Sequence, residues 1–340
     1  MPTNWGFYLW NITNALVSGN TLDSSTNGIV LFNAHFLRQP IDTYFQRQPD
    51  SFLAANHNSN GSALIQITPW AGSPVIGTQQ KGDFFLNGSP ALLWRNTNTG
   101  QNVLWPMNGT NTNSCSCCGT LSSNGLPSMP AGWVISGTAD FTGDCNNDIL
   151  WTMPGTTNVL LWMMQGPSFI SSNWLPALGN SSYGIVGTGD FSGDGKADIV
   201  ITNSFGPVIR FMDGTSKISD IPITNLPPTS TAKVVGVGDF TGSGQTDILW
   251  RDYTTGNNFV WVMQGTNVIG TNDLASQGDA NWQVQGVGDF NGDGIADILW
   301  RHAQAGSNQL WLTSSLLGTN YTNVVMPQLT NLNWAIAGPK

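Results

Sequence analysis

Residues 289–297 read Asp-Phe-Asn-Gly-Asp-Gly-Ile-Ala-Asp, and versions of this acidic phrase recur about every fifty residues along the chain. Oxygen-bearing side chains stand at its first, third, fifth and ninth positions, and glycines stand at its fourth and sixth. Calcium prefers several oxygen ligands gathered by a short, sharply bent loop. The phrase therefore predicts a calcium-binding loop.

Other copies of the phrase keep the pattern to different degrees. The copy that begins at Asp190 is nearly as complete, and the copy at Asp140 keeps all of its carboxylates. The copy at Asp239 has only two carboxylates. Asp42 and Asp83 open two eroded copies that have lost most of the ligands. Four of the copies are therefore candidate metal loops.

The candidate ligands occupy positions one, three, five, seven and nine of these four loops. They are Asp289, Asn291, Asp293, Ile295, Asp297, Asp190, Ser192, Asp194, Lys196, Asp198, Asp140, Thr142, Asp144, Asn146, Asp148, Asp239, Thr241, Ser243, Gln245 and Asp247. Turns rich in Asp and Gly also form tight loops without metal. Because the carboxylates of each loop would repel one another without a cation, we favour structural calcium, whose binding free energy becomes folding free energy.

The spacing of the copies predicts the architecture. Their first residues are separated by 41, 57, 50, 49 and 50 positions, and a period of this size is typical of a solenoid, a propeller or an array. Each period holds four short β-rich runs separated by Gly and Asn turns. No stretch shows the spacing of an amphipathic helix over a useful length. We therefore predict an all-β protein, a β-propeller of four-stranded blades.

The number of blades follows from the residues that anchor the third strand of each repeat. These anchors are Trp10, Gln66, Trp105, Trp162, Phe211, Trp261 and Trp311. They predict seven blades in one propeller domain over residues 1–340, with residues 1–82 as degenerate blades and residues 83–340 as clear ones. Residues 333–337 repeat a first strand, and pairing them with the N-terminal end would close the ring and remove exposed edges. Six blades plus a partial one is the alternative.

Residues 189–195 and 288–294 (Gly-Asp-Phe-Ser-Gly-Asp-Gly and Gly-Asp-Phe-Asn-Gly-Asp-Gly) resemble the FG-GAP repeats of integrin α-subunit propellers and their bacterial relatives. The resemblance covers residues 83–340 well and residues 1–82 only by extension. It implies a calcium-studded propeller whose loops bind ligands, often sugars or proteins. It does not imply one function, because fold and function are separable.

The composition fits an exported protein that binds metal. Only 9% of the residues are charged, against about 25% in ordinary domains. All 20 acidic residues are Asp, and four Ca²⁺ ions would bring the formal net charge of −9 to about −1. The acidity therefore indicates metal and not a basic partner. The 11 Lys and Arg residues are spread thinly, which argues against nucleic-acid binding.

The expected location is outside the cell or at its surface. No run of eighteen apolar residues exists, so we expect no membrane-spanning helix. The N-terminal residues also lack the charged and apolar pattern of a signal sequence. Export would then follow removal of a leader or use another route.

The four cysteines favour a disulfide in an oxidising compartment. Cys115, Cys117 and Cys118 crowd an insertion after Trp105, and Cys145 replaces the second glycine of the Asp140 loop. The loop between strands three and four lies on the same face as the loop between strands one and two, so the insertion could reach Cys145 in the next blade. A zinc site and free buried thiols are the alternatives.

Most tryptophans recur in phase with the repeat, as Trp94, Trp151, Trp250 and Trp300 do at the second strand. Aromatic residues at repeated positions more often pack between blades than bind sugars. Arg95, Arg251 and Arg301 follow three of these tryptophans, and we expect them to cap blade edges or to stack on Trp; contact with a sugar hydroxyl is the alternative. Trp70 and His57 lie in the irregular N-terminal region and are our candidate ligand contacts.

These patterns favour a ligand-binding module for carbohydrate or a glycoprotein over an enzyme. The alternative is an assembly protein that polymerises when the C-terminal strand of one subunit completes a blade of the next. A polysaccharide-active enzyme, with lyase-type activity, is the weakest hypothesis. The three His residues are scattered and no known catalytic motif occurs, and without Glu a paired-carboxylate glycosidase would need two Asp residues outside the metal loops.

Overall fold

The computed structural model describes residues 81–85, 88–107, 109–110, 124–203, 205–223, 231–314 and 321–340, together with the backbone of five short strands before residue 68. The chain divides into two compact units, Met1–Gln79 and Gln80–Lys340. The described residues contain no helix, and none of them forms a helix long and apolar enough to cross a membrane.

The first unit contains parallel strands. A three-stranded sheet has the order β1 (Trp5–Trp10), β3 (Asn27–Phe32), β5 (Ile65–Ile67), and β2 (Thr21–Leu22) pairs with β4 (His57–Asn58). The prediction that residues 1–82 form degenerate blades falls mostly on residues outside the described part of the chain.

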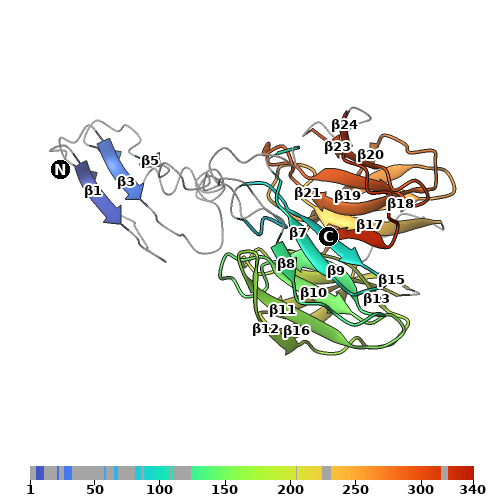
Figure 1. Ribbon diagram of the computed structural model, residues 1–340. Helices are drawn as coiled ribbons and strands as arrows, with labels where there is room; N and C mark the ends of the chain where they lie inside the picture. The colour runs from blue at the N-terminus through green and yellow to red at the C-terminus, as the bar shows by residue number, and fades with distance from the viewer. Residues whose placement is uncertain are drawn as a thin grey trace. The chain divides into compact units, whose positions relative to one another are not determined.

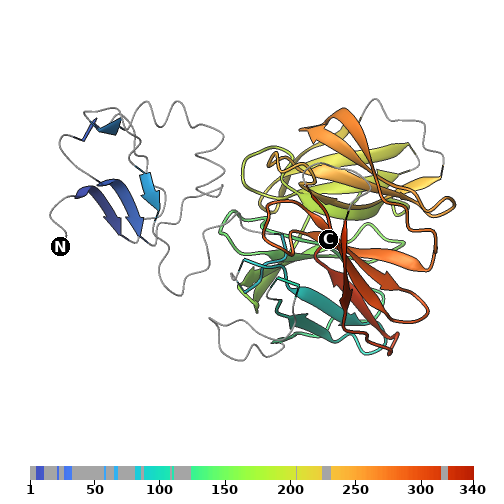
Figure 2. The same cartoon turned by 90° about the horizontal axis from the view of Figure 1, so that it is seen from above.

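The second unit is a ring of four-stranded antiparallel sheets (Figures 1 and 2). Four consecutive blades are meanders whose strands follow the chain from the centre of the ring outward. Blade 1 comprises β9 (Val134–Ala139), β10 (Asp148–Thr152), β11 (Val159–Gln165) and β12 (Ser168–Trp174); blade 2 comprises β13 (Gly184–Gly189), β14 (Asp198–Asn203), β15 (Gly206–Asp213) and β16 (Ser216–Pro222); blade 3 comprises β17 (Ala232–Gly238), β18 (Asp247–Asp252), β19 (Asn258–Gln264) and β20 (Asn267–Leu274); blade 4 comprises β21 (Trp282–Gly288), β22 (Asp297–His302), β23 (Asn308–Leu312) and β24 (Thr322–Met326).

Blade 5 joins the two ends of this unit. Its inner strand is β25 (Trp334–Gly338), and its outer three are β6 (Leu92–Asn96), β7 (Asn102–Trp105) and β8 (Asn124–Leu126). β25 pairs antiparallel with β6, with Trp334 opposite Asn96 and Ile336 opposite Trp94. Because β25 contacts both β21 and β9, the five inner strands form a closed circle.

The predicted propeller of four-stranded blades is confirmed, but the predicted number of blades is wrong. The ring has five blades, fewer than either sequence-based count. The seven-blade count included Trp10 and Gln66, which lie on β1 and β5 of the first unit. The C-terminal strand β25 pairs with β6 and not with a strand from the N-terminal end.

Glycines allow the inner strands to come this close together. Each inner strand carries a glycine near its middle or end that faces a β-branched residue or proline of the next blade. The pairs are Gly137 with Thr188, Gly187 with Val237, Gly236 with Val287, Gly286 with Pro339, and Gly338 with Thr138. A Cβ atom at these glycines would lie 2.3, 2.9, 2.5, 2.9 and 3.1 Å from the nearest atom of the facing residue. No larger residue fits at these positions without displacing the next blade.

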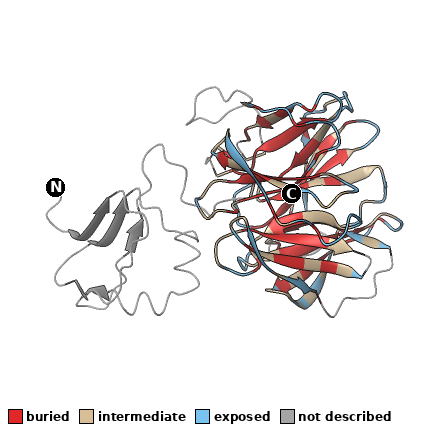
Figure 3. Cartoon of the chain, turned by 90° about the horizontal axis from the view of Figure 1, so that it is seen from below, coloured by how far each residue is buried: buried red, intermediate tan, exposed pale blue. Residues whose placement is uncertain are grey.

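The core lies between blades, in five clusters of buried residues. Figure 3 colours the buried residues of the strands red. The second-strand Trp of a blade packs against its third-strand Trp, with ring centroids 4.8 Å apart for Trp151 and Trp162 and 4.2 Å for Trp250 and Trp261. The prediction that repeat-phased tryptophans pack in the core is therefore confirmed.

The repeated arginines join neighbouring blades. Their guanidinium groups lie over the second-strand Trp of the following blade, Arg95 over Trp151 at 5.0 Å and Arg301 over Trp94 at 5.2 Å. The same groups donate hydrogen bonds to backbone carbonyls, as Arg95 does to Gly100, Met129 and Pro130. The expectation that they stack on Trp is confirmed, and these side chains are buried.

Replacing Gly137 by Ala should destabilise the ring by about 1–3 kcal/mol, the usual cost of overpacking. The new methyl group would lie 2.3 Å from Cγ2 of Thr188. Gly125→Ala is the matched control, because Gly125 also lies on a strand and a Cβ there meets nothing within 4 Å. Urea unfolding measures both variants, and equal midpoints would show that the inner-strand glycines do not limit the approach of the blades.

Candidate metal centre

The four acidic loops connect the first and second strands of blades 1 to 4 and lie at one end of the ring. The turn between the third and fourth strands lies at the same end, since the N–H of Gly166 donates to Oδ1 of Asn146 at 2.7 Å. In blade 2 the ammonium group of Lys196 forms an ion pair with Asp213 of this turn. The expectation that these two kinds of loop share a face is confirmed.

The Asp at position one folds each loop around its own carboxylate. Oδ1 of Asp289 accepts the N–H groups of Gly292 at 2.6 Å and Asp293 at 3.2 Å, and Oδ2 accepts the N–H of Gly294 at 2.8 Å. Gly294 has a φ of 83°, a left-handed conformation that glycine adopts without strain. Cys145 takes this place in the Asp140 loop with a φ of 67°.

The Asp at position nine fastens the loop to the third strand of its blade. In blade 4, Oδ2 of Asp297 accepts the N–H of Phe290 at 2.8 Å, and Oδ1 accepts the N–H of Thr313 at 2.9 Å. Asp148, Asp198 and Asp247 make the same two bonds in their own blades. All four side chains are buried. This structural role could not be inferred from the ligand pattern alone.

Burial raises the pKa values of these position-nine carboxyls. The pKa of Asp297 rises to about 8 and that of Asp148 to about 7, chiefly because the surrounding protein excludes water. The neighbouring carboxylates at positions one and five add to the shift, while the backbone hydrogen bonds oppose it. Burial therefore disfavours the charged form of these carboxyls, and a bound cation would favour it.

The remaining positions place more oxygen atoms on each loop. In the Asp289 loop, Oδ1 of Asp293 accepts the N–H of Ile295 at 2.9 Å, and Nδ2 of Asn291 donates to Oδ2 of Asp293 at 3.0 Å. In the Asp239 loop, the hydroxyl of Thr241 donates a hydrogen bond to Oγ of Ser243 at 2.9 Å. Positions three and five thus lie beside each other.

The donor chemistry of the loops fits a hard divalent cation. Every candidate side-chain donor at positions one, five and nine is an oxygen, the donor type that a hard cation prefers. A carboxylate oxygen that accepts a single N–H, as Oδ2 of Asp297 does, keeps one acceptor site for a metal. Within the described residues no three His, Cys, Asp or Glu side chains already stand close enough to hold a metal ion. The carboxylates face the loop's own N–H groups instead, and metal binding would require them to turn inward.

The eroded loop of blade 5 differs at the decisive position. Asp83 opens it and accepts the N–H of Gly88 at 2.8 Å, but position nine is Ala91, which has no carboxylate. The copy at Asp42 lies outside the described residues. Cys145 is a free cysteine among the described residues. Its predicted partners Cys115, Cys117 and Cys118 lie outside them, so the disulfide stays a prediction.

The predicted ligand contacts in the N-terminal region are not described. Trp70 lies outside the described residues, and only the backbone of His57 is described, on β4. The structure instead reveals Trp174 on the outer strand β12, where 64% of its surface is exposed. The other tryptophans of the ring lie on or beside the first three strands of their blades. Trp174 therefore breaks the repeat, which is the signal that could have identified it.

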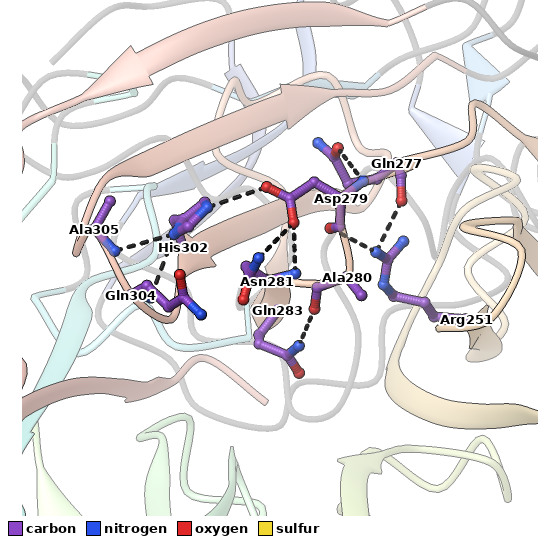
Figure 4. A network of polar contacts seen from close by, with 9 residues as sticks. All are labelled: Arg251, Gln277, Asp279, Ala280, Asn281, Gln283, His302, Gln304 and Ala305. Atoms are coloured by element: carbon purple, nitrogen blue, oxygen red, sulfur yellow. Dashed lines mark hydrogen bonds and ion pairs between the residues drawn. The ribbon is translucent and has the colours of Figure 1, made fainter.

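A polar network surrounds His302 at the opposite end of blade 4 (Figure 4). Its Nε2 lies 3.1 Å from Oδ2 of Asp279, and its Nδ1 accepts the N–H groups of Gln304 and Ala305. Asp252 caps the matching turn of blade 3 in the same way. Because both ring nitrogens are engaged, this His–Asp pair holds a turn.

The sequence comparisons agree with this architecture. A family model described as an FG-GAP-like repeat matches residues 140–201, 190–250 and 239–300. The chain carries FG-GAP-like repeats. Each match begins at the first Asp of one loop and runs to the second strand of the following blade. The sequence repeat is thus offset from the blade. No curated protein matches the chain.

Several solved structures resemble the chain at low identity. A Tc holotoxin pore from Photorhabdus luminescens is 18% identical over 73% of this chain and 12% of that chain, with a TM-score of 0.41. Virginiamycin B lyase from Staphylococcus aureus is 12% identical over 71% of each chain (TM-score 0.36). A chain of a nidogen/laminin complex is 13% identical over 70% of this chain and 93% of that one (TM-score 0.37).

Asp297→Ala should destabilise the protein even in excess chelator, because it leaves the buried N–H groups of Phe290 and Thr313 without their acceptors. Each unsatisfied N–H costs about 1–3 kcal/mol. Asp293→Ala in the same loop is the control, since Asp293 is exposed and bonds only within the loop. Chemical unfolding in EDTA measures both. Equal stability of the two variants would contradict the fastening role of position nine.

Proposed function

We propose that this chain is an exported calcium-binding β-propeller that acts as a ligand-binding module for carbohydrate or a glycoprotein. The observation that carries the proposal is the gathering of eleven Asp residues on four loops at one end of a closed ring. The low content of charged residues, 9%, supports export.

Calcium would be structural. Bound to positions one, three, five, seven and nine, it would join the two ends of each loop and neutralise the carboxylates gathered there. The Asp289 and Asp190 loops carry three carboxylates and both glycines and should fill first. The Asp239 loop carries two and should fill last or not at all.

The ligand site we favour includes Trp174. Its ring lies 5.8 Å from that of Trp133, which is buried and holds it from one side. Ser172 and Asn173 are exposed beside it on β12. An exposed indole flanked by neutral hydroxyl and amide groups suits a sugar, whose ring has an apolar face and polar edges. Trp70 and His57 remain further candidate contacts.

The assembly alternative has lost its motivation. It rested on a lone first strand at the C-terminal end of the chain, and that strand, β25, completes blade 5 within the same chain. No observation on the described residues now favours polymerisation by blade completion.

Asp293→Ala should lower the melting temperature in calcium and have little effect in excess chelator, because the chelated protein has already lost the ion from that loop. Differential scanning calorimetry under the two conditions makes the comparison. An equal loss under both conditions would assign the Asp293 carboxylate to turn geometry and would refute calcium in this loop.

Trp174→Ala should abolish or strongly weaken binding on a glycan array and leave the melting temperature nearly unchanged, because its side chain is 64% exposed. Ile218→Ala is a matched control, since Ile218 has the same exposure on the outer strand β16 of the next blade. Equal binding by the wild type and both variants would remove Trp174 from the site.

A further inference from the structure

Residue eight of each acidic loop contacts the loop of the preceding blade. It donates a hydrogen bond to the backbone carbonyl of the first Asp of that loop, from its N–H or its side chain. The bonds run from Ala197 N to Asp140 O (2.8 Å), from Thr246 Oγ1 to Asp190 O (3.0 Å) and from Ala296 N to Asp239 O (2.7 Å). Four consecutive loops are therefore joined in series.

The series continues across the closure of the ring. Asn147 is residue eight of the Asp140 loop, and its Nδ2 donates to the carbonyl of Asp83 at 3.2 Å while its Oδ1 accepts the N–H of Gly82 at 3.0 Å. The side chain of Asn147 is buried. Residue eight of the blade 5 loop is Pro90, which has no N–H and cannot form this bond with Asp289. The residue-eight bond therefore does not link the blade 5 loop to Asp289.

The same loops also lie close together at two glycines. Gly143, at position four of the Asp140 loop, lies against Lys196 at position seven of the next loop, where an added Cβ would be 3.4 Å from its Cγ. Gly242 lies against Ile295 in the same way, at 3.5 Å. Neighbouring loops therefore share a packed interface as well as a hydrogen bond.

We propose that residue eight is a positioning residue that couples the calcium loops of neighbouring blades, so that calcium binding to one loop strengthens binding to the next. This inference rests on the proposed calcium function. Residue eight stands between the ligands at positions seven and nine, and its acceptor is the carbonyl of the residue that provides the first ligand of the other loop. An ion that orders one loop therefore fixes one partner of the bond. Less conformational entropy is then lost when a second ion binds to the neighbouring loop.

The Asp239 loop should depend most on this coupling. It has only two carboxylates, and it is linked to the Asp190 loop through Thr246 and to the Asp289 loop through Ala296. The loss of one neutral hydrogen bond should weaken its calcium binding about fivefold.

Thr246 offers a clean test because its link is made by a side-chain hydroxyl and Thr246 is not a candidate ligand. Thr246→Val removes the hydroxyl and keeps the volume that packs against Gly189, and Thr246→Ser keeps a hydroxyl. Hydrogen–deuterium exchange of a peptide covering residues 239–247, titrated with CaCl₂, reports on that loop alone. The calcium midpoint should rise about fivefold in Thr246→Val and stay near the wild-type value in Thr246→Ser.

A double-mutant cycle separates coupling from a local effect on the loop. Asp194→Ala disables the Asp190 loop, and it should raise the calcium midpoint of residues 239–247 in the wild type but not in the Thr246→Val background. A midpoint that is the same in Thr246→Val and the wild type overturns the coupling and leaves the proposed calcium function intact, and so does exchange that responds to calcium in the other loops but not in residues 239–247. Exchange that does not respond to calcium in any of the four loops overturns the proposed calcium function itself.

Discussion

The ring depends on the close approach of its inner strands, which only glycine permits. Each inner strand has a glycine that meets a β-branched residue or a proline of the next blade, and the contact repeats around the circle without a gap. In blades 2 and 3 a second glycine, Gly189 or Gly238, stands directly before the first Asp of the loop and faces residue eight of the next loop, Thr246 or Ala296. The packing that closes the ring is therefore also the packing that brings neighbouring loops within hydrogen-bond reach.

The blade and its four strands could be predicted from the sequence because each repeat specifies its own turns and strands. The number of blades could not be obtained from Trp10 and Gln66, since phase alone does not show which strands join one ring. A better signal was present. A glycine stands three residues before the opening Asp of blades 1 to 4, at positions 137, 187, 236 and 286. Gly338 holds the equivalent place on the inner strand β25 of blade 5. Gln80 and Gln39 stand at this position before Asp83 and Asp42 instead.

The acidic loops show a different limit. A carboxylate at position nine satisfies the ligand pattern and also the two backbone N–H groups that it accepts in the structure, so the sequence does not separate the two roles. Burial shows which carboxylate also fastens the loop, because Asp297 is buried whereas Asp293 is exposed. Exposure likewise distinguishes Trp174 from tryptophans such as Trp151, which have the same chemistry but are buried in the packing between blades.

The two proposed functions occupy opposite ends of a blade. In blade 1 the acidic loop lies beside the turn at Gly166, where β12 begins, and Trp174 stands at the far end of the same strand. A calcium ion in the Asp140 loop would therefore not touch a ligand on Trp174. Its influence would pass through the strands of a rigid blade, whose loop it fastens at one end. Calcium should then affect the stability of the blade more than the affinity of its opposite end for a sugar. This is the behaviour of a structural metal in a binding scaffold.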